Sequence, residues 1–502
     1  MILDTHRLTS SMVGAVVLIL APLSAVRADT FDLVRDRVHD TMVAENLPSV
    51  VVGVARNGKI LWEEGFGWAD REKRIPATPH TLYALASLTK PMTTTALMVL
   101  VEQGKVSLDR PANDYLGEHK LIAHVGDARE ATIRHLATHT SGLPMHCQTF
   151  NEGERMQRPP LEKSLRRYGH LMTPPGETYV YSNFGYGVLE YVIERVSGKP
   201  YGEFMQEEVF RPLGMRESSI NRQPGSTNQV AERYSRVGAK VRFYDLDTRG
   251  AAAGYSSARD LLRFGMFNLK TPMADQKAIL SPASLDEMHR ASVQGGGPTG
   301  AWRDVGVGWL RQDEYFGTAA AVVNGGNMSG TSSILTLLPK YGVAVVVLAN
   351  TTRAGLMPIE TEVLRAVVPE ALREHLKPKL DAGLIGCWGG DIQTYAGPIA
   401  AQLHIEDDGR VRMRVGAGEF REVTNIELGS NGNRLWIRDV PGDVRTDDAA
   451  RQPYWLDFDL WRRGEALAGS VGAMARPLPD QDDNVMSYWV ELKKSVIKCG
   501  DR

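Results

Sequence analysis

The sequence has few cysteines and no excess of charge of either sign. Three cysteines among 502 residues exclude a disulfide scaffold. Lysine and arginine total 58, aspartate and glutamate total 60, and the formal net charge is −2. A chain so close to neutral has no overall attraction for nucleic acid, so we expect no nucleic-acid partner. The hydrophobic share of 43% and the charged share of 24% fit a globular protein and exclude a wholly disordered one.

Long apolar runs are absent beyond the N-terminal segment. No later stretch reaches about 18 consecutive apolar residues, so we expect no membrane-spanning helix there. An apolar run over residues 12–23 follows a short basic segment, and it is too short for a bilayer core of about 30 Å. Val26-Arg27-Ala28 then places compact side chains where signal peptidase reads them. We expect residues 1–28 to be a signal peptide cleaved after Ala28, and the protein to be exported to the periplasm or secreted. An uncleaved membrane anchor is the alternative.

The length suggests two or three domains, at about 150 residues for each. In residues 29–370, an apolar strand over 50–55 and another over 343–348 enclose helical stretches. Strands at both ends with helices between them predict an α/β (α+β) sandwich whose sheet joins distant segments. We expect residues 371–383 to form a linker. Residues 384–502 show short alternating strands and hairpin turns, which predict a small all-β barrel.

The first motif that can carry chemistry is Ser87-Leu88-Thr89-Lys90. At positions i and i+3 of a helix, Ser87 and Lys90 share a face. Pro91 follows directly and places the helix start close to Ser87, where free N–H groups favour developing negative charge. Lys90 can then hold or withdraw the serine proton. The pattern is weak alone: it recurs at Ser495, and a capping serine beside a solvent lysine explains it.

The second motif is Tyr181-Ser182-Asn183, preceded by a proline-rich turn. A tyrosine can act as a general base when a nearby cation stabilises its phenolate, and Lys90 is the candidate cation. Asn183 offers both a donor and an acceptor to a substrate amide or ester. A tyrosine packed beside a turn is the structural alternative.

The third motif is Asn324-Gly325-Gly326-Asn327, just before a strand-like run. Glycines on a strand edge let a ligand or another backbone approach closely. The backbone N–H of Asn327 is then placed to join that of Ser87 as an oxyanion hole. The alternative is an ordinary hairpin turn, because Asn-Gly-Gly is also good turn chemistry.

In this order and at these separations, the three motifs resemble the active-site serine penicillin-recognising superfamily. The similar branch contains class C β-lactamases, D-alanyl-D-alanine carboxypeptidases, and related esterases and D-aminopeptidases. Further stretches, such as residues 136–144 and 211–215, look like framework segments of that family. The resemblance implies an antiparallel sheet with helices on both faces. The segment that begins at Leu384 resembles the lipocalin-like barrel appended to some members.

The resemblance also implies acyl transfer through a covalent intermediate. Ser87 attacks the carbonyl, and Lys90 and Tyr181 move its proton to the leaving group. Asn183 positions the acyl side, and the N–H groups of Ser87 and Asn327 hold the oxyanion.

Asn324 departs from the family pattern, which usually has Lys or His at this position. A neutral amide forms no full ion pair with a substrate carboxylate. We therefore expect an ester, amide or peptide substrate without that carboxylate rather than a penicillin. Arg353 or another basic residue is a possible compensating cation.

The leading hypothesis is an exported serine hydrolase that acts on a small-molecule ester or amide, or on a peptide. The alternatives are a β-lactamase, a cell-wall D-aminopeptidase or carboxypeptidase, and a non-catalytic sensor of the penicillin-binding type. We expect no cofactor. A metal site at His135 and His139 is not expected, because no zinc-protease glutamate accompanies them. The oligomeric state stays open.

We expect Cys387 to lie in the first strand of the predicted barrel and Cys499 just beyond its last strand. If the barrel closes, its first and last strands are neighbours, and a disulfide between these residues becomes feasible. Free thiols are the alternative. If that disulfide forms, Cys147 has no partner.

Overall fold

The computed structural model describes residues 31–153, 155, 157–221, 229–294, 304–315, 319–369, 383–394, 397–423, 426–428, 434–442, 454–475 and 485–495. The predicted signal peptide, nearly all of the predicted linker and Cys499 lie outside these residues. In the described ranges, no helix combines the length and the apolar character needed to cross a membrane.

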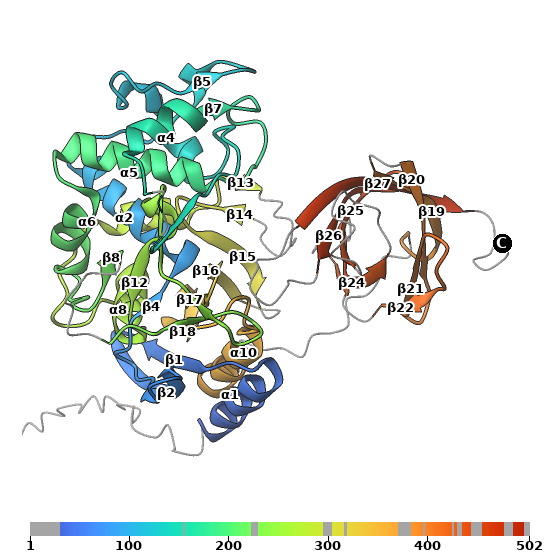
Figure 1. Cartoon of the computed structure of the whole chain (residues 1–502), viewed down its shortest axis with the longest axis horizontal. Helices are drawn as coiled ribbons and strands as arrows, with labels where there is room; N and C mark the ends of the chain where they lie inside the picture. Colours follow the sequence, from blue (N-terminus) through green and yellow to red (C-terminus); the bar gives the residue numbers. More distant parts are fainter. Residues whose placement is uncertain are drawn as a thin grey trace, which may run out of the picture.

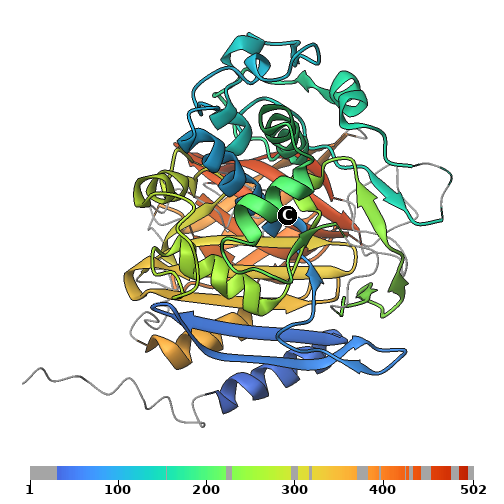
Figure 2. The same cartoon turned by 90° about the vertical axis from the view of Figure 1, so that its left-hand side faces the viewer.

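A nine-stranded antiparallel sheet forms the centre of the first part of the chain, in the order β13-β14-β15-β16-β17-β18-β1-β2-β3. Its strands are β1 (Ser49–Arg56), β2 (Lys59–Asp70), β3 (Ile75–Pro76), β13 (Val293–Gln294), β14 (Asp304–Val305), β15 (Leu310–Tyr315), β16 (Ala319–Met328), β17 (Thr331–Leu338) and β18 (Val343–Ala349). The pairing of β1 with β18 joins the two ends of this part, as the strand pattern predicted. Figure 2 shows the blue first strands beside the orange late ones.

The two central strands are buried on both faces, which explains their unbroken apolar sequence. Val50, Val52 and Val54 of β1 belong to one hydrophobic cluster, and Val51 and Ala55 belong to another. Residues of β18 alternate between the same two clusters. The sheet therefore separates two hydrophobic layers, because successive side chains of a strand point to opposite faces.

Helices cover both layers. One cluster contains residues of α1 (Asp32–Glu45) and α10 (Met357–Val367), which pack against the sheet. These two helices lie side by side (Figure 1). The other cluster takes residues from most of the remaining helices: α2 (Thr89–Glu102), α3 (Ile133–Ala137), α4 (Leu161–Tyr168), α5 (Asn183–Ser197), α6 (Tyr201–Phe204), α7 (Arg249–Ala252), α8 (Ala258–Asn268) and α9 (Pro282–His289). This arrangement confirms the predicted sandwich.

Short helical turns and small sheets connect these layers. The turns are η2 (Ala86–Leu88), η3 (Ala112–Asp114), η4 (Ala128–Glu130), η5 (Met205–Phe210) and η6 (Pro339–Tyr341). The small strands are β4 (Tyr83–Ala84), β5 (Ile122–Ala123), β6 (Thr149–Asn151), β7 (His170–Leu171), β8 (Ser219–Ile220), β9 (Arg233–Tyr234), β10 (Lys240–Val241), β11 (Tyr244–Leu246) and β12 (Gly254–Ser256).

The C-terminal strands form a second antiparallel sheet that curls around its own core (Figure 1). They are β19 (Gly386–Thr394), β20 (Gly397–Ile405), β21 (Val411–Val415), β22 (Arg421–Glu422), β23 (Ile426–Leu428), β24 (Arg434–Gly442), β25 (Tyr454–Arg463), β26 (Ala466–Ala475) and β27 (Val485–Ser495). The expected alternation holds in β25, where Leu456, Phe458 and Leu460 enter the core.

The first and last strands of this sheet are neighbours, since β19 pairs with β27. The two ends of the described sheet are instead β22 and β23. Cys387 lies in β19 opposite Ser495 and is disulfide-bonded, whereas Cys147 is a free thiol.

Candidate active site

The turn that carries Ser87 joins strand β4 to helix α2. Ser87 lies in the short η2 turn, and the α-helix begins two residues later at Thr89. The serine is therefore not part of the α-helix, although Pro91 marks the helix start as predicted. Ala86, directly before Ser87, has a φ of 48°, a left-handed conformation that is rare for a residue with a side chain. This constrained turn leaves Ser87 half-buried beside the proposed catalytic groups.

Lys90 is buried and surrounded by acceptors. It is 2% exposed. Its Nζ donates to Ser87 Oγ at 3.1 Å, to Asn183 Oδ1 at 2.8 Å and to the carbonyl oxygen of Ala251 at 3.1 Å. An ammonium has three N–H donors, so these three acceptors satisfy it completely. The carbonyl of Ala251 was not predicted, because a backbone acceptor leaves no signal in the sequence.

Tyr181 lies on the other side of the serine. Its Oη is 2.8 Å from Ser87 Oγ, and Lys90 Nζ lies 4.8 Å from the centre of its ring. The tyrosine ends a segment that leads into α5, whose first turn is capped by Ser182: the Ser182 Oγ accepts from the N–H of Gly185. This cap fixes the backbone directly after Tyr181.

His139 packs against Tyr181 with a ring separation of 4.4 Å. Its Nδ1 accepts the backbone N–H of Ser182 at 3.0 Å. Burial, followed by the nearby charge of Lys90, lowers the pKa of His139 well below its ordinary value. A neutral His139 therefore supports the tyrosine without adding a second positive charge. In the described ranges, no three His, Cys, Asp or Glu side chains gather as a metal-binding group.

The glycines of the third motif lie inside strand β16, and the hairpin turn follows the motif instead of containing it. A Cβ on Gly326 would lie 1.9 Å from the oxygen of Leu85 and 2.8 Å from the nitrogen of Ser87. Only glycine permits this approach. The approach brings the strand against the serine turn, and it explains why the motif needs a residue without a side chain there.

The two asparagines of this motif are anchored differently. Asn324 is 6% exposed, and its Nδ2 donates to the carbonyl of Gly308 at 3.0 Å. Asn327 is exposed, and its Oδ1 accepts the backbone N–H of Arg353 at 2.9 Å. The structure thus brings Ser87, Lys90, Tyr181 and Asn183 into one hydrogen-bonded group, and it places the β16 motif beside the serine turn.

These contacts place a possible proton acceptor beside the serine. Ser87 Oγ accepts from Lys90 Nζ, and Tyr181 Oη, within hydrogen-bond distance of Ser87 Oγ, can take the serine proton when it is a phenolate, a form that a nearby ammonium stabilises. A hydroxyl activated in this way is a nucleophile, and the adjacent phenol can return the proton to a leaving group.

The fold described above agrees with a match to a known protein family. The family model described as "Beta-lactamase" matches residues 34–368, about two thirds of the chain. The chain therefore belongs to the beta-lactamase family of serine hydrolases, as the motifs predicted.

The individual relatives are diverse. An unguisins hydrolase of Aspergillus campestris is 27% identical over 335 residues, which cover 63% of this chain and 60% of that protein. The octameric penicillin-binding protein homologue of Pyrococcus abyssi shares the fold, with a TM-score of 0.59, 20% identity, and coverage of 92% of this chain and 99% of that chain. The D-amino acid amidase of Ochrobactrum anthropi SV3 has a TM-score of 0.55, 23% identity, and coverage of 68% and 98%. The chain spans about three fifths of the length of the curated relatives that it matches.

Proposed function

We propose that this protein is an exported serine hydrolase that cleaves an ester, amide or peptide bond through an acyl-enzyme on Ser87. The observation that carries the proposal is the contact of three groups: Ser87 Oγ lies 3.1 Å from the Lys90 ammonium and 2.8 Å from the Tyr181 hydroxyl. Two residues 94 positions apart in sequence meet here. A serine in this environment has a proton acceptor and a cation within hydrogen-bond distance.

In the first half-reaction, Tyr181 acts as a phenolate stabilised by the Lys90 ammonium. Ser87 Oγ bonds to the substrate carbonyl carbon, and the serine proton passes to this phenolate. The backbone N–H groups of Ser87 and Asn327 receive the oxyanion, at about 3 kcal/mol for each donor. The bond to the leaving group then breaks, and the leaving group takes the proton from Tyr181. Asn183, held by Lys90, positions the acyl side.

In the second half-reaction, water replaces the leaving group. It gives one proton to Tyr181 and bonds to the acyl carbon. The bond to Ser87 breaks, and the serine recovers its proton while the carboxylic acid leaves. Lys90 donates to Ser87 Oγ, and its ammonium stabilises the phenolate of Tyr181.

Asn324 favours esters, amides or peptides over penicillins. Its amide is buried and donates to Gly308, so the position that usually carries a cation supplies none. The D-amino acid amidase among the structural neighbours acts on an amide, which supports an amide or ester as the substrate class.

Hydrolysis of nitrophenyl esters and amino-acid amides tests the proposal. Ser87→Ala should abolish turnover, because it removes the nucleophile. Ser495→Ala is the matched control, since Ser495 has the same S-x-x-K spacing and should leave turnover unchanged. Turnover that survives Ser87→Ala would reject the nucleophile. A protein that binds these compounds without turnover, before any mutation, would favour the sensor alternative.

A further inference from the structure

Helix α7 supplies the carbonyl that holds Lys90, so the placement of this short helix matters to the catalytic group. The carbonyl oxygen of Ala251 accepts from Lys90 Nζ at 3.1 Å. The two preceding peptide groups are bonded as well: the N–H of Gly250 donates to Glu190 Oε2 at 2.8 Å, and the carbonyl of Gly250 accepts from Thr93 Oγ1 at 2.6 Å. Three consecutive peptide groups of α7 therefore each bond to a buried side chain.

Glu190 is the acidic member of this set, and it takes no part in the proton transfers proposed above. It lies in α5 and is 1% exposed. Its other oxygen, Oε1, accepts from Arg158 Nη2 at 3.2 Å. Burial raises the pKa of Glu190 to about 7, and the charge of Arg158 opposes this rise. A carboxyl group keeps an acceptor oxygen in both protonation states, so the bond to Gly250 does not require the charge.

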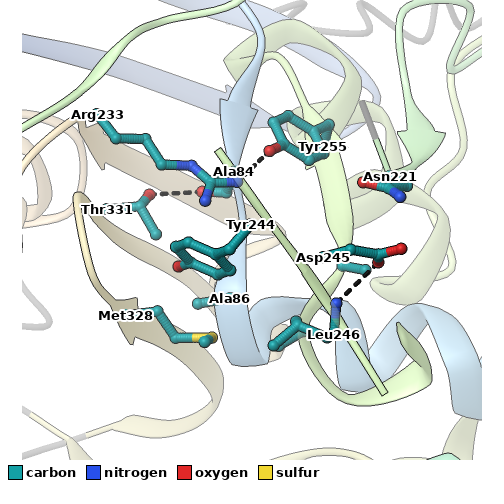
Figure 3. Close-up of a pocket in the computed structure, with 12 residues that line it drawn as sticks. Ala84, Ala86, Asn221, Arg233, Tyr244, Asp245, Leu246, Tyr255, Met328 and Thr331 are labelled. Carbon is teal, nitrogen blue, oxygen red and sulfur yellow. Dashed lines mark hydrogen bonds between the residues drawn. The ribbon is translucent and has the colours of Figure 1, made fainter. Parts of the chain in front are cut away.

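Arg158 ties Glu190 to the segment that leads into α7. Its Nε donates to the carbonyl of Leu246 at 2.7 Å. Asp245 fixes the same segment: its Oδ1 accepts the backbone N–H of Leu246 at 2.8 Å (Figure 3), and its Oδ2 pairs with Arg249 at 2.6 Å. The backbone before α7 and the first residue of the helix are therefore held by the same group of charged side chains.

Two glycines let α5 and the α7 region approach closely enough for these bonds. A Cβ on Gly250 would lie 2.7 Å from the carbonyl oxygen of Tyr186 and 3.0 Å from the Cβ of Glu190. In α5, a Cβ on Gly187 would lie 2.6 Å from the Cγ2 of Thr248. Such distances exclude a side chain at both positions. The two segments are thus in direct contact, and a displacement of one moves the other.

Helix α5 therefore controls two of the three acceptors of Lys90. Asn183, at the start of α5, accepts from the ammonium directly. Glu190, further along the same helix, acts through α7. We propose that Glu190, anchored by Arg158, is a positioning residue for Lys90. By holding the N–H before the Ala251 carbonyl, it fixes that carbonyl, which in turn holds the ammonium against the nucleophile. This inference rests on the proposed function.

Substitutions of Glu190 test the inference on a neutral nitrophenyl ester. Glu190→Met keeps the shape of the side chain but removes both oxygens. It should lower kcat by about tenfold to a hundredfold while the KM changes by less than about threefold. Glu190→Gln keeps an amide oxygen for the Gly250 N–H, so its kcat should stay within about threefold of the wild-type value. Glu360→Met removes an equally buried acid on the other face of the sheet and should leave kcat for each active site unchanged.

Labelling with a fluorophosphonate separates positioning from folding. The final amount of labelled protein counts the folded active sites, and the rate constant of labelling measures the reactivity of each site. Glu190→Met should reach the wild-type amount with a rate constant lowered by the same factor as kcat. A lower final amount with a wild-type rate constant shows a structural role and overturns the inference. A wild-type rate constant with wild-type kcat, or equal losses in Glu190→Gln and Glu190→Met, also overturns it.

Hydrogen exchange at the Gly250 amide tests the contact without relying on catalysis. Exchange should be slow in wild-type protein and in Glu190→Gln, and much faster in Glu190→Met. Equal protection in all three proteins overturns the inference. If Glu190→Met does not fold, Arg158→Met decides: it should lower kcat by at least about threefold with little change in KM, and an unchanged kcat overturns the inference. Turnover that survives Ser87→Ala rejects the proposed function itself and leaves the exchange result standing.

Discussion

At the residue scale, the site depends on how Lys90 distributes its three donors. One contacts the nucleophile, one holds the side chain of Asn183, and one binds the backbone of Ala251. This arrangement fixes the ammonium, and in the proposed mechanism the serine proton passes to Tyr181, which lies within hydrogen-bond distance of Ser87 Oγ. Loss of the phenol hydroxyl should therefore impair chemistry more than binding.

Tyr181→Phe should lower kcat by about a hundredfold to ten-thousandfold, the usual contribution of a general acid or base. The KM should change little, because the ring and its packing on His139 remain. Tyr179→Phe is the control: Tyr179 also lies against His139 but is not placed in the proton transfer. Steady-state kinetics on one ester measures both variants. Equal rates for Tyr181→Phe and wild-type protein would remove the tyrosine from the mechanism.

The sequence predicts part of this site well. Ser87, Lys90, Tyr181 and Asn183 stand in short motifs, and their types indicate their chemistry. The carbonyl of Ala251, which accepts from Lys90, stands in no motif, because only coordinates place a backbone acceptor. The buried hydrogen bond from Asn324 to the carbonyl of Gly308 could not be predicted either, because it depends on which loop packs against β16.

At the element scale, strands were easier to predict than the contacts between elements. The apolar runs of β1 and β18 follow from burial on both faces, and the glycine after α5 marks its end, with a left-handed φ of 70° at Gly198. The β16 motif allowed both a strand and a turn. The approach to Leu85 and Ser87 decides this in favour of the strand, and it is a tertiary contact that local sequence does not encode.

Helix α10 carries a buried acid that makes stability depend on pH. Glu360 is fully buried, and both of its oxygens accept from the hydroxyl of Tyr315, at 3.1 and 3.0 Å. Burial raises its pKa from 4.5 to about 7. The unfolded chain then loses this proton at a lower pH than the folded chain. The protonated Glu360 therefore stabilises the folded state fully below pH 4.5. This stabilisation decreases as the pH rises to about 7 and is absent above that pH.

Glu360→Gln should remove this dependence. We compare the unfolding free energies of the variant and of the wild-type protein. As the pH rises from 4.5 to about 7, the difference should shift by about 2 to 3 kcal/mol in favour of the variant. Denaturant unfolding of both proteins at both pH values measures this shift. The contributions of the other acidic residues are common to the two proteins and cancel in the comparison. Glu362→Gln, on the same helix, is the control. A constant difference between Glu360→Gln and wild-type protein at all pH values would contradict the raised pKa.

At the scale of the whole molecule, the chain has separate hydrophobic cores. Two clusters lie on the faces of the nine-stranded sheet, and a third lies inside the C-terminal sheet. The sequence indicated this division through a change from mixed patterns to short alternating strands. The predicted domain limits at residues 370 and 384 stay predictions. The two edge strands of the described C-terminal sheet, β22 and β23, could not be predicted. Hairpin signals identify neighbouring strands, but they do not identify the edges of a sheet.

The central claim is that the contact with Lys90 and Tyr181 makes Ser87 the nucleophile. The most direct measurement is the mass of the intact protein and of its peptides after brief incubation with a fluorophosphonate. One adduct should form on the peptide that contains Ser87. It should be absent in Ser87→Ala and should form far more slowly in Tyr181→Phe and Lys90→Met. An adduct on another residue, or labelling of Tyr181→Phe and Lys90→Met at the wild-type rate, would contradict this account.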